Sequence, residues 1–301
     1  MTDHPSGHSL LPPEPVRRAR VTSTDGVRLN VESYGPEDPA TPSVVLIHGW
    51  TCSIPFWAPV IRALRDDLHV IAYDLRGHGR SDPAGPGGCS VEALADDLEA
   101  VLDQTLPAGG RAVLAGHSMG GMTIMAAASR ACVLSRTDGV LLASTGSANL
   151  MGEALAVPFG AFIPAFVTLQ RWLLTSAAPL GPFGLLARPL LGYMTLGPGA
   201  PPEVEAVNAA IIASCDRRAR AAWGHVLSGL DLIDGVHRLD VPTYVLVGSA
   251  DQVTPPVHAR QLPQLAGLTE LPRIGHMTPL EAPGAVTELI RKLAAGAGGS
   301  G

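Results

Sequence analysis

The sequence predicts an α/β fold in which helices flank a mostly parallel sheet of eight strands. Three observations support this: short apolar runs alternate with helical patterns, several runs are apolar at every position, and one long interval contains no strand candidate. Alternation of strands and helices favours right-handed crossover units. Continuous apolar runs such as Val44–Ile47 and Tyr244–Val247 are typical of strands buried on both faces of a parallel sheet.

The first two strands are predicted to form a hairpin. The runs Arg20–Thr24 and Val27–Tyr34 flank Asp25-Gly26, which is a strong signal for a two-residue turn. The six later strand candidates are Val44–Ile47, Val70–Tyr73, Ala112–Ala115, Gly139–Ala143, Thr243–Val247 and, more weakly, Thr269–Leu271. Helices are expected at Phe56–Arg65, Val91–Leu106, Met119–Ala131 and Ala285–Leu293, with Ser90 as the N-cap of the second.

The interval without strands divides the chain into parts. Residues 147–235 are apolar, proline-rich and helical in pattern, so we expect them to form a helical cap inserted into one core domain. The core is then formed by residues 21–146 and 236–295. Residues 1–20 and 296–301 have little to bury, and we expect a disordered lead and a disordered tail.

Composition excludes several classes of protein. The chain has 301 residues, of which 46% are apolar and only 16% charged, and its net charge is −6. A nucleic-acid partner is therefore not expected, because such proteins need a basic face. The most apolar stretch, residues 154–169, is interrupted by Pro158 and Pro164 and is too short to span a bilayer. Four scattered cysteines and the lack of a signal peptide indicate reduced thiols and a cytoplasmic location.

The strongest functional signal is the segment Gly116-His117-Ser118-Met119-Gly120-Gly121. It follows an apolar run and precedes a small-residue helix, which is the context of a G-x-S-x-G nucleophile elbow. The turn would hold Ser118 in a strained conformation that lifts its hydroxyl clear of the sheet, and glycines two positions away avoid a collision. A dinucleotide-binding turn is the alternative, but its G-x-G-x-x-G pattern is absent. We therefore predict that Ser118 is a nucleophile.

A serine nucleophile needs a base, and the base needs an orienting acid. Among the ten histidines, His276 lies in the loop between the last strand candidate and the last helix, where α/β sheets place their sites. Asp251 comes directly after the strand Thr243–Val247 and is the matching acid; the alternative is an aspartate that only caps a helix or a turn. The order Ser118, Asp251, His276 is the one expected for this elbow.

Two further segments carry a resemblance to a known family. His48-Gly49-Trp50 follows the third strand candidate, and Asp74–Asp82 (Asp-Leu-Arg-Gly-His-Gly-Arg-Ser-Asp) follows the fourth. Together with the elbow and the two loops, they make residues 21–295 resemble serine-nucleophile α/β-hydrolase-fold enzymes with a helical cap, of the esterase and lipase type. Relatives that resemble this scaffold but use aspartate at the elbow, such as haloalkane dehalogenases and epoxide hydrolases, are disfavoured by Ser118.

The resemblance implies an oxyanion hole made by the backbone N–H groups of Trp50 and Met119. One lost donor of this kind typically lowers the rate by roughly 10²–10³. The alternative for Trp50 is simple core packing. Arg76 and Asp82 are expected to fix loops instead of touching substrate. No cofactor is expected, and no metal, because no H-E-x-x-H motif or clustered ligand set occurs.

The expected cap carries the information on substrate polarity. Its stretch from Ala154 to Pro202 contains 49 residues and only two charges, Arg171 and Arg188. One interpretation is the buried face of the cap itself; the other is an apolar pocket or a surface that contacts lipid transiently. On the second interpretation the pocket residues are Phe159, Phe162, Phe166 and Trp172. Either way, a strongly anionic or sugar-like substrate is disfavoured.

The sequence therefore predicts a cofactor-independent serine hydrolase that cleaves a small, apolar or lipid-like carboxylic ester. The same triad also supports thioester hydrolysis, acyl transfer, carbon–carbon bond hydrolysis or perhydrolysis. A ligand-binding protein that retains the hydrolase fold is an alternative of another class. The presence of all three triad candidates and both oxyanion donors favours an enzyme.

Overall fold

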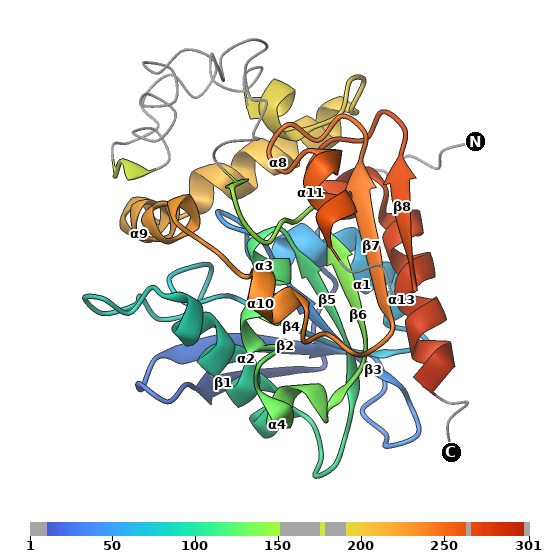
Figure 1. Cartoon of the computed structure of the whole chain (residues 1–301). Helices are drawn as coiled ribbons and strands as arrows, with labels where there is room; N and C mark the ends of the chain where they lie inside the picture. Colours follow the sequence, from blue (N-terminus) through green and yellow to red (C-terminus); the bar gives the residue numbers. More distant parts are fainter. Residues whose placement is uncertain (1–10, 151–174, 178–190, 263–265, 298–301) are drawn as a thin grey trace.

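A central sheet organises the molecule, for which the computed structural model describes residues 11–150, 175–177, 191–262 and 266–297. The sheet has eight strands in the order β1-β2-β4-β3-β5-β6-β7-β8 (Figure 1). β1 pairs antiparallel with β2 and β2 antiparallel with β4, whereas the other pairs are parallel. The strands are β1 (Arg17–Thr22), β2 (Arg28–Tyr34), β3 (Ser43–Ile47), β4 (His69–Tyr73), β5 (Ala112–His117), β6 (Thr137–Ala143), β7 (Thr243–Gly248) and β8 (Gly267–Leu271). The predicted fold class is confirmed.

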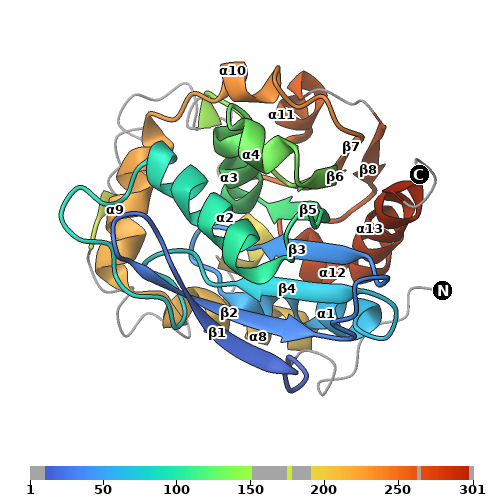
Figure 2. The ribbon, with the colours of Figure 1, turned by 90° about the horizontal axis from the view of Figure 1, so that it is seen from below.

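Helices cover both faces of this sheet, as Figure 2 shows. One face carries α2 (Val91–Thr105), α3 (Met119–Ala127), α4 (Ala131–Leu134), α10 (Ile233–Val236) and α11 (Pro256–Gln261). The other carries α1 (Ala58–Leu64), preceded by the 3-10 turn Ile54–Trp57, together with α12 (Thr278–Glu281) and α13 (Pro283–Ala297).

Two hydrophobic cores explain why the central strands are apolar at every position. Val45 and Ile47 of β3 belong to the core under α2 and α3, whereas Val44 and Leu46 belong to the core under α1 and α13. All four side chains are fully buried. Successive residues of a strand point to opposite faces, so burial of both faces requires a continuous apolar run.

The hairpin forms, but its connection differs from the prediction. β1 begins at Arg17, in the part of the chain assigned to the lead, and Thr22 pairs with Arg28, so five residues join the strands instead of two. In the longer loop, the exposed Asp25 places its Oδ2 2.7 Å from Nη1 of the buried Arg76. The early start was not visible in the sequence because β1 is an edge strand with mostly exposed side chains.

The helices also differ at their ends. α3 ends at Ala127, four residues before the predicted end, and α13 continues to Ala297, two residues into the predicted tail. The Ser90 cap of α2 is present: its Oγ accepts a hydrogen bond from Ala93 N–H at 3.1 Å. No helix among the described residues is long and apolar enough to cross a membrane.

Between β6 and β7 the described residues contain helices and one isolated bridge, between Ala148 and Asp231, and no strand. α8 (Pro202–Ser214) lies over the carboxyl ends of the strands, and α9 (Arg217–Ser228) follows it (Figure 1). Two indoles dock α9 on the core. Trp223 Nε1 donates to the Arg76 carbonyl at 3.2 Å, and Trp50 Nε1 donates to the Arg220 carbonyl at 3.0 Å.

Candidate active site

Ser118 occupies the tight turn between β5 and α3, where its backbone angles are φ 52° and ψ −118°. A positive φ is uncommon for a residue with a side chain and stores strain. Neighbouring strand ends hold the turn in place. Ser118 N–H donates to the Ala143 carbonyl at 3.0 Å, and the Ser118 carbonyl accepts from Met122 N–H at 3.1 Å and from Thr145 Oγ1 at 2.8 Å.

Glycines make this turn sterically feasible. A Cβ at Gly116 would lie 2.5 Å from the carbonyl carbon of Gly120, and a Cβ at Gly120 would lie 2.0 Å from the carbonyl oxygen of Ile47. Both distances are far inside van der Waals contact, so no side chain fits at either position. α3 can therefore begin in direct contact with the end of β3.

His276 and Asp251 form a hydrogen-bonded pair at the carboxyl ends of β7 and β8. His276 Nδ1 lies 2.9 Å from Oδ2 and 3.1 Å from Oδ1 of Asp251. The carboxylate also accepts from the N–H groups of Val253 at 2.9 Å and Thr254 at 2.8 Å. Asp251 is 3% exposed and His276 4% exposed. This arrangement keeps a proton on Nδ1 and leaves Nε2 as the basic atom.

Thr254 completes this pair and was not singled out from the sequence. Its Oγ1 lies 3.0 Å from Asp251 Oδ2 and 3.2 Å from His276 Nδ1. The available signal was its spacing, because aspartates commonly accept hydrogen bonds from residues two and three positions later in a turn.

His117 joins the pair to the elbow. Its Nε2 donates to the His276 carbonyl at 2.9 Å, and the two ring centroids are 4.9 Å apart. Because His117 directly precedes Ser118, His276 is held next to the elbow. No described residue forms a hydrogen bond with Ser118 Oγ, so the structure pairs His276 with Asp251 and leaves the serine hydroxyl unpaired. A serine–histidine bond commonly tightens only when substrate binds.

The predicted oxyanion donors flank the serine. A Cβ at Gly49 would lie 3.0 Å from Ser118 Cβ, so the turn that leads to Trp50 packs directly on the elbow. Met119 begins α3, and the first N–H groups of a helix have no partner within the helix. No described residue accepts a hydrogen bond from the N–H of Trp50 or of Met119.

Two buried histidines brace the turns around these donors. His48 Nδ1 donates to the Gly49 carbonyl at 2.8 Å and its Nε2 accepts from Leu75 N–H at 3.0 Å. His78 Nε2 accepts from Thr51 N–H at 3.3 Å. Burial lowers the pKa of His48 to about 4 and that of His78 to about 3. Both rings are therefore neutral near pH 7, as an acceptor nitrogen requires.

Arg76 and Asp82 lie in loop-fixing networks. Arg76 is fully buried, and its Nη2 lies 2.6 Å from Oδ1 of Asp97. Asp82 accepts from Arg28 Nε at 2.8 Å. Neither of these contacts involves Ser118, so Arg76 and Asp82 stabilise the loops that surround the site.

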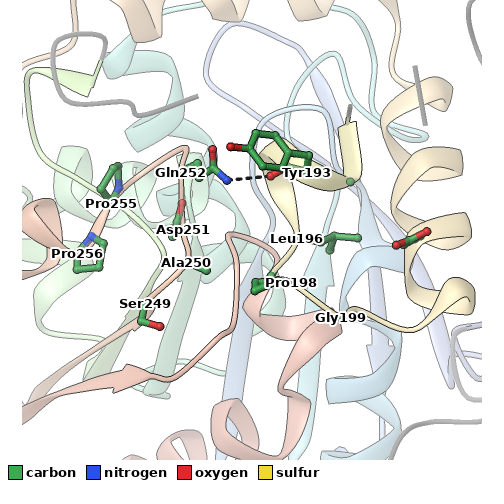
Figure 3. Close-up of a pocket in the computed structure, with 13 residues that line it drawn as sticks. Tyr193, Leu196, Pro198, Gly199, Ser249, Ala250, Asp251, Gln252, Pro255 and Pro256 are labelled. Atoms are coloured by element: carbon green, nitrogen blue, oxygen red, sulfur yellow. Dashed lines mark hydrogen bonds between the residues drawn. The ribbon is translucent and has the colours of Figure 1, made fainter. Parts of the chain in front are cut away.

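A cavity of about 450 Å³ lies behind the acid, between the Asp251 loop and the segment that leads into α8 (Figure 3). Figure 3 shows Ser249, Gln252 and Pro255 on one side and Tyr193, Leu196 and Pro198 on the other. Gln252 Nε2 bridges the two sides by donating to the Tyr193 carbonyl at 3.1 Å. The predicted pocket residues Phe159, Phe162, Phe166 and Trp172 lie outside the described residues. Among the described residues, no three His, Cys, Asp or Glu side chains are placed to bind a metal ion.

Comparison with known proteins assigns the family. A family model described as "Alpha/beta hydrolase family" matches residues 44–289, which is most of the chain. The chain belongs to the alpha/beta hydrolase family. Membership agrees with the sheet order and with the position of the elbow after β5.

The proteins to which this chain is similar include esterases. A bifunctional esterase/perhydrolase of Acinetobacter calcoaceticus is 29% identical over 78% of this chain and 83% of its own length. A non-haem chloroperoxidase of Streptomyces lividans is 30% identical over 78% of this chain and 83% of its own. Among solved structures, a thermophilic esterase from Thermogutta terrifontis is 27% identical, with a TM-score of 0.75 over 94% of this chain and 99% of that chain.

Proposed function

We propose that the protein is a serine hydrolase that cleaves a carboxylic ester with an apolar acyl or alcohol part. One observation carries the proposal: a buried aspartate–histidine pair, joined at 2.9 Å, is held beside a serine in a strained strand-to-helix turn. Ester hydrolysis also fits the esterases among the similar proteins. The apolar preference is supported by the near absence of charge between residues 154 and 202.

In the proposed mechanism, Ser118 Oγ attacks the ester carbonyl carbon while His276 Nε2 takes the hydroxyl proton. The carbonyl oxygen becomes an oxyanion that accepts hydrogen bonds from the N–H groups of Trp50 and Met119. Asp251 keeps the imidazole in the required tautomer and stabilises the imidazolium. The tetrahedral intermediate then releases the alcohol, which takes the proton from His276.

Hydrolysis of the acyl-enzyme repeats these steps with water. His276 Nε2 removes a proton from a water molecule, whose oxygen attacks the acyl carbon. The intermediate collapses to the carboxylic acid, and Ser118 recovers its proton from His276. His276 thus passes on each proton that it takes, the first to the alcohol and the second to Ser118, within one turnover.

The first test replaces Ser118 by alanine. We expect turnover of p-nitrophenyl esters and labelling by a fluorophosphonate to be lost, while the circular dichroism spectrum stays that of the wild type. Ser228→Ala is the matched control, because among the described residues the Ser228 hydroxyl bonds only the His225 carbonyl, within α9. Undiminished activity in Ser118→Ala would refute the proposal, and failure of the wild-type protein to react with the fluorophosphonate would favour a ligand-binding protein.

The acyl preference is tested by a chain-length series. We expect p-nitrophenyl esters of medium or long acyl chains to be cleaved with a higher kcat/KM than the acetate. A preference for acetate would contradict an apolar acyl pocket. Acyl-CoA thioesters and added alcohol acceptors, run in parallel, distinguish a thioesterase or an acyltransferase from an esterase.

Perhydrolysis is a second candidate, favoured by the similar esterase/perhydrolase and chloroperoxidase. Hydrogen peroxide would replace water in the attack on the acyl-enzyme, which gives a peracid and free Ser118. Peracid formation from an ester and hydrogen peroxide, absent in Ser118→Ala, is the expected result. No peracid from the wild-type protein would exclude this activity.

We also infer a cytoplasmic location. All four cysteines, Cys52, Cys89, Cys132 and Cys215, are free thiols, which is usual where the compartment is reducing. Cell fractionation checks this, and recovery of the protein from a secreted fraction would contradict it.

A further inference from the structure

A partly buried contact joins the His276 loop to a distant segment of the chain, residues 195–199. The Thr195 carbonyl accepts hydrogen bonds from His276 N–H at 2.8 Å and from Met277 N–H at 3.2 Å. Arg273 Nη2 donates to the Pro198 carbonyl at 3.1 Å. The backbone of the proposed base is thus held by a segment some eighty residues earlier in the sequence.

The two backbones approach too closely for side chains. A Cβ at Gly275 would lie 2.4 Å from Gly197 N, and a Cβ at Gly197 would lie 2.1 Å from the Arg273 carbonyl oxygen. Close packing of this kind turns two N–H groups, those of Gly197 and Gly275, inward. Buried N–H groups need an acceptor, because each one left unpaired is strongly destabilising.

One carboxylate satisfies both groups. Glu281, the last residue of α12, accepts from Gly197 N–H through Oε2 at 2.6 Å and from Gly275 N–H through both oxygens at 3.1 Å. Burial raises the pKa of Glu281, and the nearby charge of Asp251 raises it further. Among the described residues, backbone N–H groups and no cationic side chain hold the carboxylate at this position.

We propose that Glu281 is a positioning residue, which fixes the His276 loop against residues 195–199 and so places the imidazole relative to Ser118. This inference rests on the proposed function, in which His276 is the general base. Through Gly197 the carboxylate also reaches the segment that lines the cavity behind Asp251. Glu281 therefore connects the loop of the proposed base to residues 195–199, which precede α8.

The test compares Glu281→Ala, Glu281→Gln and a control. In Glu281→Ala both N–H groups lose their acceptor. We expect kcat to fall by about 10- to 100-fold for an ester whose hydrolysis depends on Ser118, since small displacements of a catalytic group have effects of this size. KM is expected to change by less than about threefold, because the substrate-binding groups stay in place. Amide hydrogen exchange at Gly197 and Gly275 is expected to accelerate at least tenfold.

Glu281→Gln keeps one oxygen that both N–H groups can share, but its amide group faces the Gly275 N–H. We expect partial rescue, with kcat and exchange rates between those of the wild type and Glu281→Ala. Glu288→Gln, on the exposed side of α13 where Glu288 pairs with Lys292, is expected to behave as the wild type in both measurements. Thermal unfolding confirms that each variant is folded at the assay temperature.

Wild-type kcat together with unchanged exchange in Glu281→Ala would overturn the proposal. If Glu281→Ala does not fold, Glu281→Gln decides: values equal to those of the wild type in both measurements overturn it. If the wild-type protein cleaves no ester, the proposed function fails separately. Faster amide hydrogen exchange at Gly197 and Gly275 in the variants would then still support the positioning role of Glu281, and unchanged exchange would overturn that role.

Discussion

The two halves of the candidate site are built in different ways. The shape of the nucleophile half, residues 47–51 and 116–121, requires residues without a side chain, since any Cβ at Gly116 or Gly120 would overlap backbone atoms. The acid–base half, residues 251–254 and 273–281, has one such glycine, Gly275, but also depends on hydrogen bonds to distant parts of the chain, such as that from His276 N–H to the Thr195 carbonyl. Steric requirements leave a local motif in the sequence, whereas long-range hydrogen bonds do not.

The largest expected effect comes from breaking the acid–base half alone. Asp251→Asn keeps the size of the side chain but presents an amide to His276 Nδ1, which favours the wrong tautomer. We expect kcat to fall by about 10³–10⁴, by analogy with the loss found for the corresponding change in a Ser-His-Asp protease. Ester turnover at saturating substrate measures the effect.

The control for this change is Asp66→Asn, because the Asp66 side chain is 86% exposed and, in the part of the chain that the structure describes, contacts only Arg65 at the surface. The nucleophile half should stay intact in Asp251→Asn, so its unfolding midpoint in urea should stay near that of the wild type. Activity within tenfold of the wild type would contradict the assignment of Asp251.

The nucleophile half should be destabilised by steric overlap when a side chain is introduced at one of its glycines. In Gly120→Ala the new methyl group would lie 2.0 Å from the Ile47 carbonyl oxygen, so β3 and α3 must separate. We expect the free energy of unfolding to fall by about 3 kcal/mol or more, at or beyond the upper end of usual overpacking effects. Gly284→Ala, where a Cβ meets no atom within 4 Å, should be neutral or slightly stabilising in the same urea experiment. Equal stability of the two variants would contradict this steric account.

The buried histidines of the nucleophile half make a prediction about pH. Burial lowers the pKa of His78 to about 3 in the folded protein, while an unfolded chain has a value near 6.5. Between these values only the unfolded chain binds the proton, so this contribution to stability is complete above pH 6.5 and is lost as the pH falls. Urea unfolding of the wild type and His78→Gln at pH 7, 6 and 5 should show a shallower fall in the variant, by up to about 1.4 kcal/mol per pH unit. If the free energies of unfolding of the wild type and His78→Gln fall in parallel with pH, the stabilising role of the neutral His78 is contradicted.

The smallest effect is expected where α9 docks on the core. Trp223→Phe removes the indole hydrogen bond to the Arg76 carbonyl and should lower the free energy of unfolding by about 1 kcal/mol beyond the loss of ring area. Trp57→Phe is the matched control: Trp57 is equally buried, but its indole nitrogen has no partner among the described residues. If Trp57→Phe is as destabilising as Trp223→Phe, the indole bond contributes nothing.

The same contrast decides what the sequence could predict. The inner strands could be predicted because their side chains are buried on one or both faces, whereas the mostly exposed residues of β1 left its start unseen and the half-exposed residues of β8 gave a weaker signal. Ser118, Asp251 and His276 could be chosen because each follows a strand in a short motif. Glu281 could not, because its role depends on the Gly197 N–H, and neither could Thr254 as a partner of His276 Nδ1.

The strand order also has a consequence for synthesis of the chain. From β5 onward, each new strand joins the same edge of the sheet in sequence order. A chain emerging from the ribosome can therefore complete the serine turn on β5 and β6, while His276 still lies 159 residues beyond His117. On the proposed mechanism, such an unfinished chain exposes a serine without its base. Translation of β7, β8 and the loop after them then acts as the step that switches the enzyme on.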